Sequence, residues 1–161
     1  MNIFEKLLHI EEVSAHCDVP CGIYDPFPAQ IAALTTVRMI DQMTDILASD
    51  HSEMEKLNTF TRLVAVKEEH AEKVKHEIRV IWGDFIKADQ IKAYPQIHEL
   101  THEIMQLGSK VKQAAKREDA VKLVEKVNEF AKIFWAIKGE ETVEMEAPYK
   151  PNLKLVYRKA K

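Results

Sequence analysis

The sequence of 161 residues predicts an all-α fold, an antiparallel up-down four-helix bundle, on three observations. Only 4 glycines and 6 prolines are present, so turns are few and the elements between them are long. Four segments place apolar residues at alternating steps of three and four, which is the period of an amphipathic helix. Apolar residues make up 46% and charged residues 30%, as in a globular domain with one core. Short connections between four such helices favour a bundle.

Charge and hydropathy exclude two classes of partner. The chain carries 23 Lys and Arg against 26 Asp and Glu, a formal net charge of −3. Nucleic-acid-binding proteins usually show a basic excess instead. No apolar run approaches the roughly 20 residues that a helix needs to span a bilayer. We therefore expect neither a nucleic-acid partner nor a membrane partner.

Residues 1–15 are expected to form a leader that is removed on maturation. Their apolar residues suit a short amphipathic helix, and Val13-Ser14-Ala15 suits cleavage after a small residue. The apolar stretch is brief, is interrupted by His9 and is followed by Glu11-Glu12, unlike a secretory signal. We therefore expect a cytoplasmic protein. The alternative is an ordinary N-terminal helix that stays attached.

The next segment, residues 16–28, reads HCDVPCGIYDPFP and contains three prolines and one glycine. This composition excludes a helix and predicts a compact loop. The loop holds both cysteines of the chain, Cys17 and Cys21. Spacing alone leaves three interpretations: a small disulfide loop, half of a zinc site that needs two further ligands, or a self-contained metal hook.

The first two helices of the bundle, which covers residues 29–139, follow from the apolar period. The first helix is predicted to begin at Ala29 and to end near Asp50. Asn58 is the predicted N-cap of the second helix, which ends within residues 83–87. Lys67 interrupts the apolar stripe of this second helix.

The third and fourth helices keep the same period. Pro95 is the predicted first residue of the third helix, since proline is favoured at that position. The fourth helix is predicted to begin near Glu118 or Asp119 and to stop at Gly139. The tail, residues 140–161, could wrap around the bundle or make an edge contact, and the sequence does not decide between these.

The third helix also contains His98-Glu99-Leu100-Thr101-His102, which matches the H-E-x-x-H pattern of zinc proteases. The spacing puts both histidines on one helical face. No third-ligand pattern follows, however, and the chain shows no strand signal for a substrate-binding edge. We therefore expect His98 and His102 to be surface or interface residues.

Cleavage of the peptide bond before His16 would give the loop a further metal ligand, a free α-amine. The free α-amine, the next backbone nitrogen and the sulfurs of Cys17 and Cys21 would then offer two nitrogens and two sulfurs, with the His16 ring as an axial ligand. Such a tetragonal set favours Ni(II) or Cu(II) over zinc. Anionic thiolate and amide donors raise the electron density on the metal and stabilise Ni(III), so the site could cycle by one electron.

The run HCDVPCGIYDP, residues 16–26, closely resembles the metal hook of nickel-containing superoxide dismutases. The similarity extends over residues 16–138 through four further motifs: VKEEH, IWGDF, YPQIH and KIFW. It implies an enzyme, an oxidoreductase that converts two superoxide anions and two protons to dioxygen and hydrogen peroxide, with one nickel ion per subunit cycling between Ni(II) and Ni(III). It also implies a homohexamer and a processing protease that removes the leader.

The resemblance assigns roles to individual residues. It implies that nickel is held by the α-amine and imidazole of His16, the backbone nitrogen and sulfur of Cys17 and the sulfur of Cys21. Tyr24 matches the family tyrosine beside the open face of the metal. Asp18 matches a residue whose backbone amide lines the approach, and Pro20 matches the proline that sets the turn.

The chain also departs from the family pattern. Ala33 and His70 stand at the positions of a glutamate and an arginine that orient the axial imidazole in some members, so His70 is a candidate partner of the His16 ring. Phe85 replaces a common tyrosine. Lys87 is a candidate for steering the superoxide anion. Two alternatives stay open: a nickel-binding or storage module without turnover, and a helical interaction protein with an inert loop disulfide.

Overall fold

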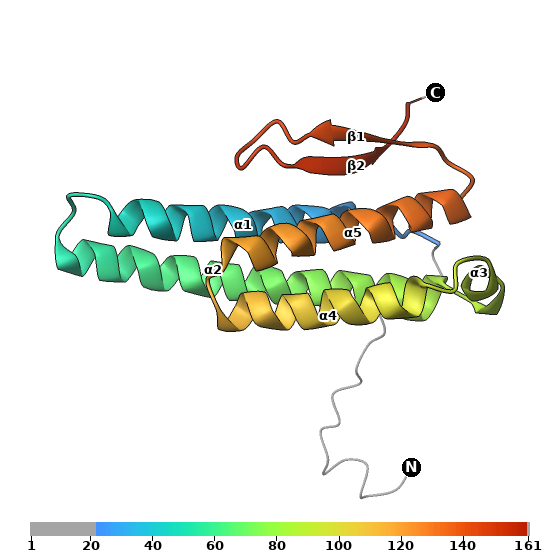
Figure 1. Cartoon of the computed structure of the whole chain (residues 1–161), viewed down its shortest axis with the longest axis horizontal. Coiled ribbons are helices and arrows are strands. Elements are labelled where there is room, and N and C mark those ends of the chain that lie inside the picture. The colour runs from blue at the N-terminus through green and yellow to red at the C-terminus, as the bar shows by residue number, and fades with distance from the viewer. Residues whose placement is uncertain (1–21, 161) are drawn as a thin grey trace, which may run out of the picture.

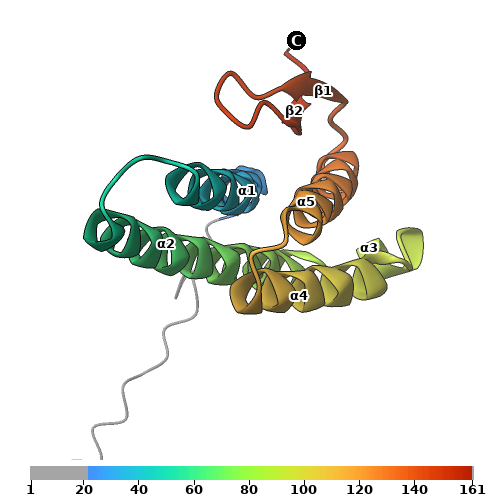
Figure 2. The same ribbon diagram turned by 60° about the vertical axis from the view of Figure 1, so that its left-hand side comes forward.

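A computed structural model describes residues 22–160, and most of them are helical. The four long helices lie side by side in two layers, α1 with α5 and α2 with α4 (Figures 1 and 2). Each packs against two neighbours, and successive long helices run in opposite directions (Figure 1). The prediction of a mostly helical protein is confirmed. The bounds of the long helices are α1 Phe27–Leu47, α2 Glu53–Val80, α4 Ile97–Gln113 and α5 Arg117–Ile137.

The start of α2 corrects the prediction that Asn58 caps this helix. Ser52 is the N-cap, and Asn58 lies inside the helix. The backbone N–H of Glu55 donates to Ser52 Oγ (3.4 Å), and the backbone N–H of Ser52 donates to Glu55 Oε2 (3.0 Å). This reciprocal capping box satisfies two amides that have no partner within the helix. The prediction began too late because the apolar stripe begins only at Phe60, whereas the first turns of α2 are largely exposed.

The connection from α2 to α4 is more structured than the sequence indicated. A π-helical turn, Ile81–Phe85, follows α2, and a short helix α3, Ala88–Ala93, comes next. Pro95 lies in a turn, and α4 begins at Ile97, whose N–H donates to the carbonyl of Tyr94 (3.0 Å). The prediction that Pro95 is the first residue of this helix is therefore wrong by two positions.

The end of α5 agrees with its predicted stop. Gly139 adopts a left-handed backbone with φ +72, which favours glycine. The N–H of Gly139 donates to the carbonyl of Ala136 (3.0 Å), and the N–H of Glu140 donates to the carbonyl of Trp135 (3.0 Å). These bonds satisfy carbonyls at the helix end and turn the chain out of α5.

The tail requires one correction to the all-α prediction. Strands β1, Thr142–Glu146, and β2, Lys154–Arg158, form an antiparallel hairpin in which Glu144 faces Val156. An isolated two-stranded hairpin is marginally stable in water. Here the hairpin lies over the layer of α1 and α5 (Figures 1 and 2), and Leu155 and Val156 are buried. Packing against the bundle therefore stabilises this strand pair.

The core lies between the two helical layers and is filled by apolar side chains on the predicted helical faces. The largest fully buried side chains in the described part of the chain include Phe130, Phe134, Ile78, Ile104 and Leu123. Within residues 22–160, no helix combines the length and the apolar character needed to cross a membrane.

Candidate metal centre

The predicted nickel ligands His16, Cys17 and Cys21 lie outside the described residues, as do Asp18, Pro20 and the leader, residues 1–15. The described chain begins at Gly22, which is exposed and has φ +68, a backbone conformation that L side chains rarely adopt. Residues 22–28 lead from the predicted ligands into the first two residues of α1, and we call this segment the hook root. Its contacts show where the hook joins the bundle.

Tyr24 joins the hook root to an aromatic cluster at the end of the bundle where α1 begins. The ring centre of Tyr24 lies 5.5 Å from that of Phe85, at the end of the π-helical turn. Phe85 lies 5.0 Å from Phe134, and Phe134 lies 5.0 Å from Trp135, both on α5. Phe134 is 1% exposed, so the cluster continues into the core. Tilted and edge-on ring pairs of this kind add stability beyond the area that they bury.

Two basic side chains lie against the rings of this cluster, and a third basic residue is close to it in the sequence. Lys138 Nζ lies 5.3 Å from the ring centre of Phe85, and Arg158 Cζ lies 5.9 Å from that of Trp135. Lys87, the predicted steering residue, is exposed two positions after Phe85. Positive side chains near a site raise the encounter rate of an anionic substrate. The arrangement therefore suits an anion that approaches the end of the bundle.

The structure describes three of the residues at which this chain differs from the family pattern. Phe85 supplies a packing surface for Tyr24 but has no hydroxyl. Ala33 is fully buried, and its methyl group cannot orient an imidazole. His70 Nδ1 lies 2.9 Å from the carbonyl oxygen of Val66, one turn earlier in α2. Whether His70 also contacts the His16 ring stays a prediction, because His16 lies outside the described residues.

The H-E-x-x-H motif does not form a metal site in the described structure. His98, Glu99 and His102 are all exposed, and Trp82 Nε1 donates a hydrogen bond to His98 Nδ1 (3.0 Å). Across residues 22–160 there is no group of three or more His, Cys, Asp or Glu side chains that could hold a metal ion. Both histidines are exposed, in agreement with the prediction that they are surface or interface residues.

The sequence reasoning missed a contact between the hairpin and the hook root. The ring centre of Tyr157, on β2, lies 5.9 Å from that of Phe27. Residues of the hook root, α5 and β2 line one shallow cavity at this place; they include Asp25, Phe27, Trp135, Tyr157 and Arg158. No local signal predicts a contact between residues 130 positions apart. The β-branched and aromatic residues within Lys154–Arg158 could at most have indicated a strand.

Comparisons of the sequence with known proteins agree on one family. The sequence model of a family described as nickel-containing superoxide dismutase matches residues 11–138, so the match ends before the hairpin. "Superoxide dismutase [Ni]" of Streptomyces seoulensis is 34% identical over 127 residues, covering 79% of this chain and 91% of the relative. The protein of the same name from Streptomyces coelicolor is 32% identical over 126 residues, covering 78% and 90%.

Solved structures agree with the sequence matches. The native structure of nickel superoxide dismutase at 1.30 Å has a TM-score of 0.68 and 31% identity, covering 76% of this chain and 99% of the solved chain. A crystal structure of nickel-containing superoxide dismutase with nickel ligation corresponding to the oxidized state also has a TM-score of 0.68, with 32% identity and coverage of 77% and 99%.

Proposed function

The chain belongs to the family of nickel-containing superoxide dismutases, and we propose that residues 16–21 hold its nickel ion. It is an oxidoreductase with a nickel cofactor that disproportionates superoxide. Two superoxide anions and two protons yield one dioxygen and one hydrogen peroxide, so one superoxide is oxidised while the other is reduced.

The donor set of residues 16–21 fits nickel. Cys17 and Cys21 are the only cysteines of the chain, and His16 adds an imidazole next to them. Thiolates suit soft metals, and sets of nitrogen and sulfur donors accept a tetragonal ion. When bound, nickel supplies a one-electron change between Ni(II) and Ni(III). The absence of a competing cluster of ligands within residues 22–160 supports placing the ion at the hook.

Removal of the leader after Ala15 belongs to the same proposal. A processing protease would make His16 the first residue and would convert its amide nitrogen into a free amine. An amide nitrogen that keeps its proton is a poor metal ligand, whereas the lone pair of a free neutral amine is available, and this amine would also begin the chelate that the deprotonated Cys17 nitrogen extends. The precursor would therefore bind nickel weakly, and the mature chain would bind it tightly.

The residues around the hook root would serve the reaction in two ways. The Tyr24 ring packs on Phe85 at 5.5 Å, so its position is set by the bundle, where it would limit access to the ion and order water. Lys87 and Lys138, both exposed, would attract the superoxide anion. Assembly as a homohexamer, which the resemblance to the family supports, and a cytoplasmic location, which the non-secretory character of residues 1–15 supports, complete the proposal.

Substitution of the two cysteines tests the ligand assignment. Cys17→Ser and Cys21→Ser, made in the mature chain, should each abolish superoxide dismutation and nickel binding and leave the helical circular dichroism unchanged. His98→Ala is the matched control, because this exposed histidine lies in the H-E-x-x-H motif and should not affect activity. Full activity in either cysteine variant would overturn the assignment.

The processing step is tested by comparing two forms of the chain. One form begins at His16, and the other keeps residues 1–15 through a blocked cleavage site. Both are supplied with nickel, and their N-terminal masses, metal contents and superoxide turnover are measured. The form that begins at His16 should bind nickel tightly and be active, whereas the form with the leader should bind it weakly and be inactive. Equal turnover in the form with the leader would contradict the role of the α-amine.

A further inference from the structure

We propose that the C-terminal hairpin, β1 and β2 with their loop, positions the hook root and thereby the nickel ligands, with Tyr157 and Gln30 as positioning residues. The inference rests on the proposed nickel hook and adds a part of the chain beyond residues 11–138, which match the family. It follows from three contacts that connect β2 to the beginning of α1.

The first contact joins the hairpin directly to the hook root. The ring of the half-buried Tyr157 lies 5.9 Å from that of Phe27, at an interplanar angle of 48°. The backbone N–H of Phe27 also donates to Asp25 Oδ1 (2.7 Å), which closes a tight turn between these two residues. A ring that restrains Phe27 therefore also restrains Asp25, next to Tyr24.

The second contact holds β2 at one position on the bundle. Gln30, on α1, is 1% exposed, and its Nε2 donates to Asn128 Oδ1 (2.9 Å) and to the carbonyl of Val156 (3.0 Å). The N–H of Val156 donates to Asn128 Oδ1 (3.3 Å), while Asn128 Nδ2 donates to the carbonyl of Lys154 (2.8 Å). Both backbone groups of Val156 are thus bonded to helix side chains. A shift of β2 by one residue would break these bonds and leave the buried amides of Gln30 and Asn128 without their partners.

The third contact joins β2 to the aromatic cluster that contains Tyr24. Arg158, the last residue of β2, lies with its guanidinium 5.9 Å from the Trp135 ring centre. Trp135 packs on Phe134, which packs on Phe85, the partner of Tyr24. Consecutive residues of β2 therefore contact both the hook root and the cluster that holds Tyr24.

This arrangement matters because a metal site depends on supports beyond its ligands. The ligands here precede the exposed residues Gly22 and Ile23, so the hook leaves the bundle through a short exposed segment. Supporting contacts keep ligands in a productive geometry, and their loss typically costs about 10- to 100-fold in metal affinity or activity. The hairpin adds such a support at the point where the hook joins α1.

Four variants of the mature, full-length chain test the proposal. Tyr157→Ala removes the ring contact from the hairpin, and Phe27→Ala removes the same contact from the hook root. Tyr157→Phe keeps the ring and is the rescue variant. Tyr149→Ala is the matched control, because this hairpin tyrosine is 44% exposed and has no ring contact with the hook root.

Two measurements are made on each variant. In the nickel-loaded protein, release of nickel to a chelator is followed together with the absorption and electron paramagnetic resonance of the bound ion. In the nickel-free protein, backbone hydrogen exchange is followed over residues 22–30. We expect Tyr157→Ala and Phe27→Ala to release nickel about tenfold faster, to alter the spectra and to exchange faster. Tyr157→Phe and Tyr149→Ala should behave as the wild type.

The outcomes separate this inference from the proposed function. Wild-type nickel release and exchange in both Tyr157→Ala and Phe27→Ala would overturn the positioning role. If Tyr157→Ala loses its helical structure, Phe27→Ala decides, because it leaves the hairpin unchanged. If the wild type binds no nickel, the proposed nickel site is contradicted. Backbone hydrogen exchange over residues 22–30 of the nickel-free proteins then decides by itself whether the hairpin restrains the hook root.

Discussion

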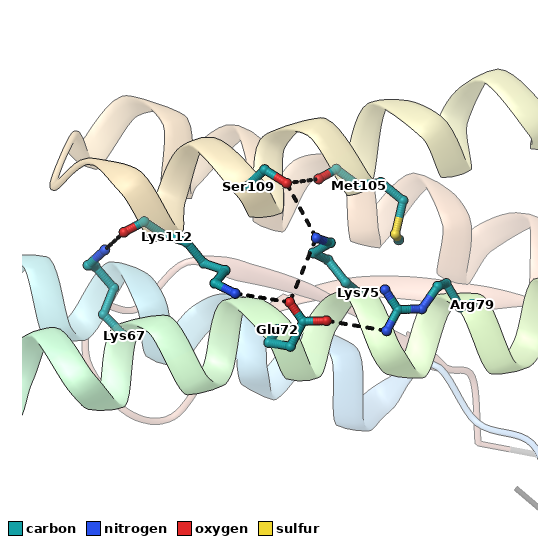
Figure 3. Close-up of polar contacts among 7 residues, drawn as sticks. All are labelled: Lys67, Glu72, Lys75, Arg79, Met105, Ser109 and Lys112. Atoms are coloured by element: carbon teal, nitrogen blue, oxygen red, sulfur yellow. Dashed lines mark hydrogen bonds and ion pairs between the residues drawn. The ribbon is translucent and has the colours of Figure 1, made fainter. Parts of the chain in front are cut away.

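The contacts between the hairpin and the layer of α1 and α5 differ in kind from those between α2 and α4. The buried polar contacts of the first set are neutral amides: Gln30 and Asn128 are 1% and 9% exposed and bond to each other and to β2, while the ion pair of Lys132 with Glu144 is half-exposed. The second set uses charged side chains near solvent (Figure 3). Glu72 accepts from Lys112 (3.2 Å) and Arg79 (3.3 Å), and Lys75 lies 3.7 Å away.

This difference shows which contacts specify one arrangement. A buried amide that loses its partner keeps its full desolvation cost, so the amide pair tolerates little change. Half-exposed charges exchange their partners for water, and each pair contributes about 1 kcal/mol or less. The specific contacts therefore lie beside the hook root, where position matters, and the tolerant contacts lie away from it.

Lys67 is an exception within the α2–α4 interface. It is 2% exposed, and its Nζ donates to two carbonyls in the last turn of α4, those of Val111 (2.5 Å) and Lys112 (2.7 Å). Figure 3 shows the bond to Lys112. These carbonyls have no partner within the helix, and a cation there also suits the helix dipole. Burial lowers the pKa of Lys67, against the charge of Glu68, which raises it. Lys67, which interrupts the apolar stripe of α2 in the sequence, is therefore a buried cap of the C-terminal end of α4.

The largest effect is expected from Gln30→Glu, which breaks the amide pair. The carboxylate would face Asn128 Oδ1 and the Val156 carbonyl, two acceptors, inside the protein. We expect a loss of about 3 kcal/mol in the free energy of unfolding at pH 7, measured by urea denaturation. The loss should shrink in acid, because a neutral carboxyl restores a donor. Gln42→Glu, on the same helix but partly exposed, is the control.

Lys67→Met should give the next largest effect. The substitution keeps an apolar stem but leaves the carbonyls of Val111 and Lys112 without their charged donor. We expect a loss of about 2 kcal/mol in thermal or urea unfolding, since hydrogen bonds to charged groups are the stronger ones. The exposed Lys73→Met should change stability by less than about 0.5 kcal/mol. Equal effects at the two lysines would refute the capping role.

Gly108→Ala tests how closely α2 and α4 approach. A Cβ at Gly108 would lie 2.8 Å from Lys75 Cγ and 3.5 Å from the Ala71 carbonyl oxygen. Alanine alone would favour the helix by about 1 kcal/mol over glycine. We expect this gain to be absent and a net loss of about 1 kcal/mol to appear instead. Shortening the neighbour in Gly108→Ala/Lys75→Ala should recover stability, and a stabilised single variant would contradict the close contact.

Glu72→Gln should have the smallest effect, about 0.5 kcal/mol at pH 7, because its ion pairs are half-exposed. Burial raises the pKa of Glu72, but hydrogen bonds from Lys112 and Arg79 and the charge of Lys75 outweigh it, so the pKa lies below its usual value. Its contribution is then present above the unfolded pKa and is lost as the pH falls through the folded one. Wild type and variant should therefore converge in acid, and a gap that widens there would exclude this network.

Several features could be predicted from local patterns. The alternating steps of three and four indicated the apolar faces of the four long helices, and Gly139 indicated the end of α5. The residues HCDVPC at 16–21 indicated a metal-binding segment, and this stays a prediction because the segment lies outside the described residues. The N-cap of α2 could also have been predicted, since Ser52 and Glu55 have the spacing of a capping box. The prediction relied on the apolar stripe instead and therefore placed the cap at Asn58.

The sequence alone determined the helical period and the presence of a donor set, because both depend on residues close together in the chain. Only the tertiary structure decided that the tail forms a hairpin on α1 and α5, that Lys67 caps α4 and that Tyr157 lies against Phe27. Each of these requires two distant segments to meet, and the stability of the contact depends on what the rest of the fold excludes from water.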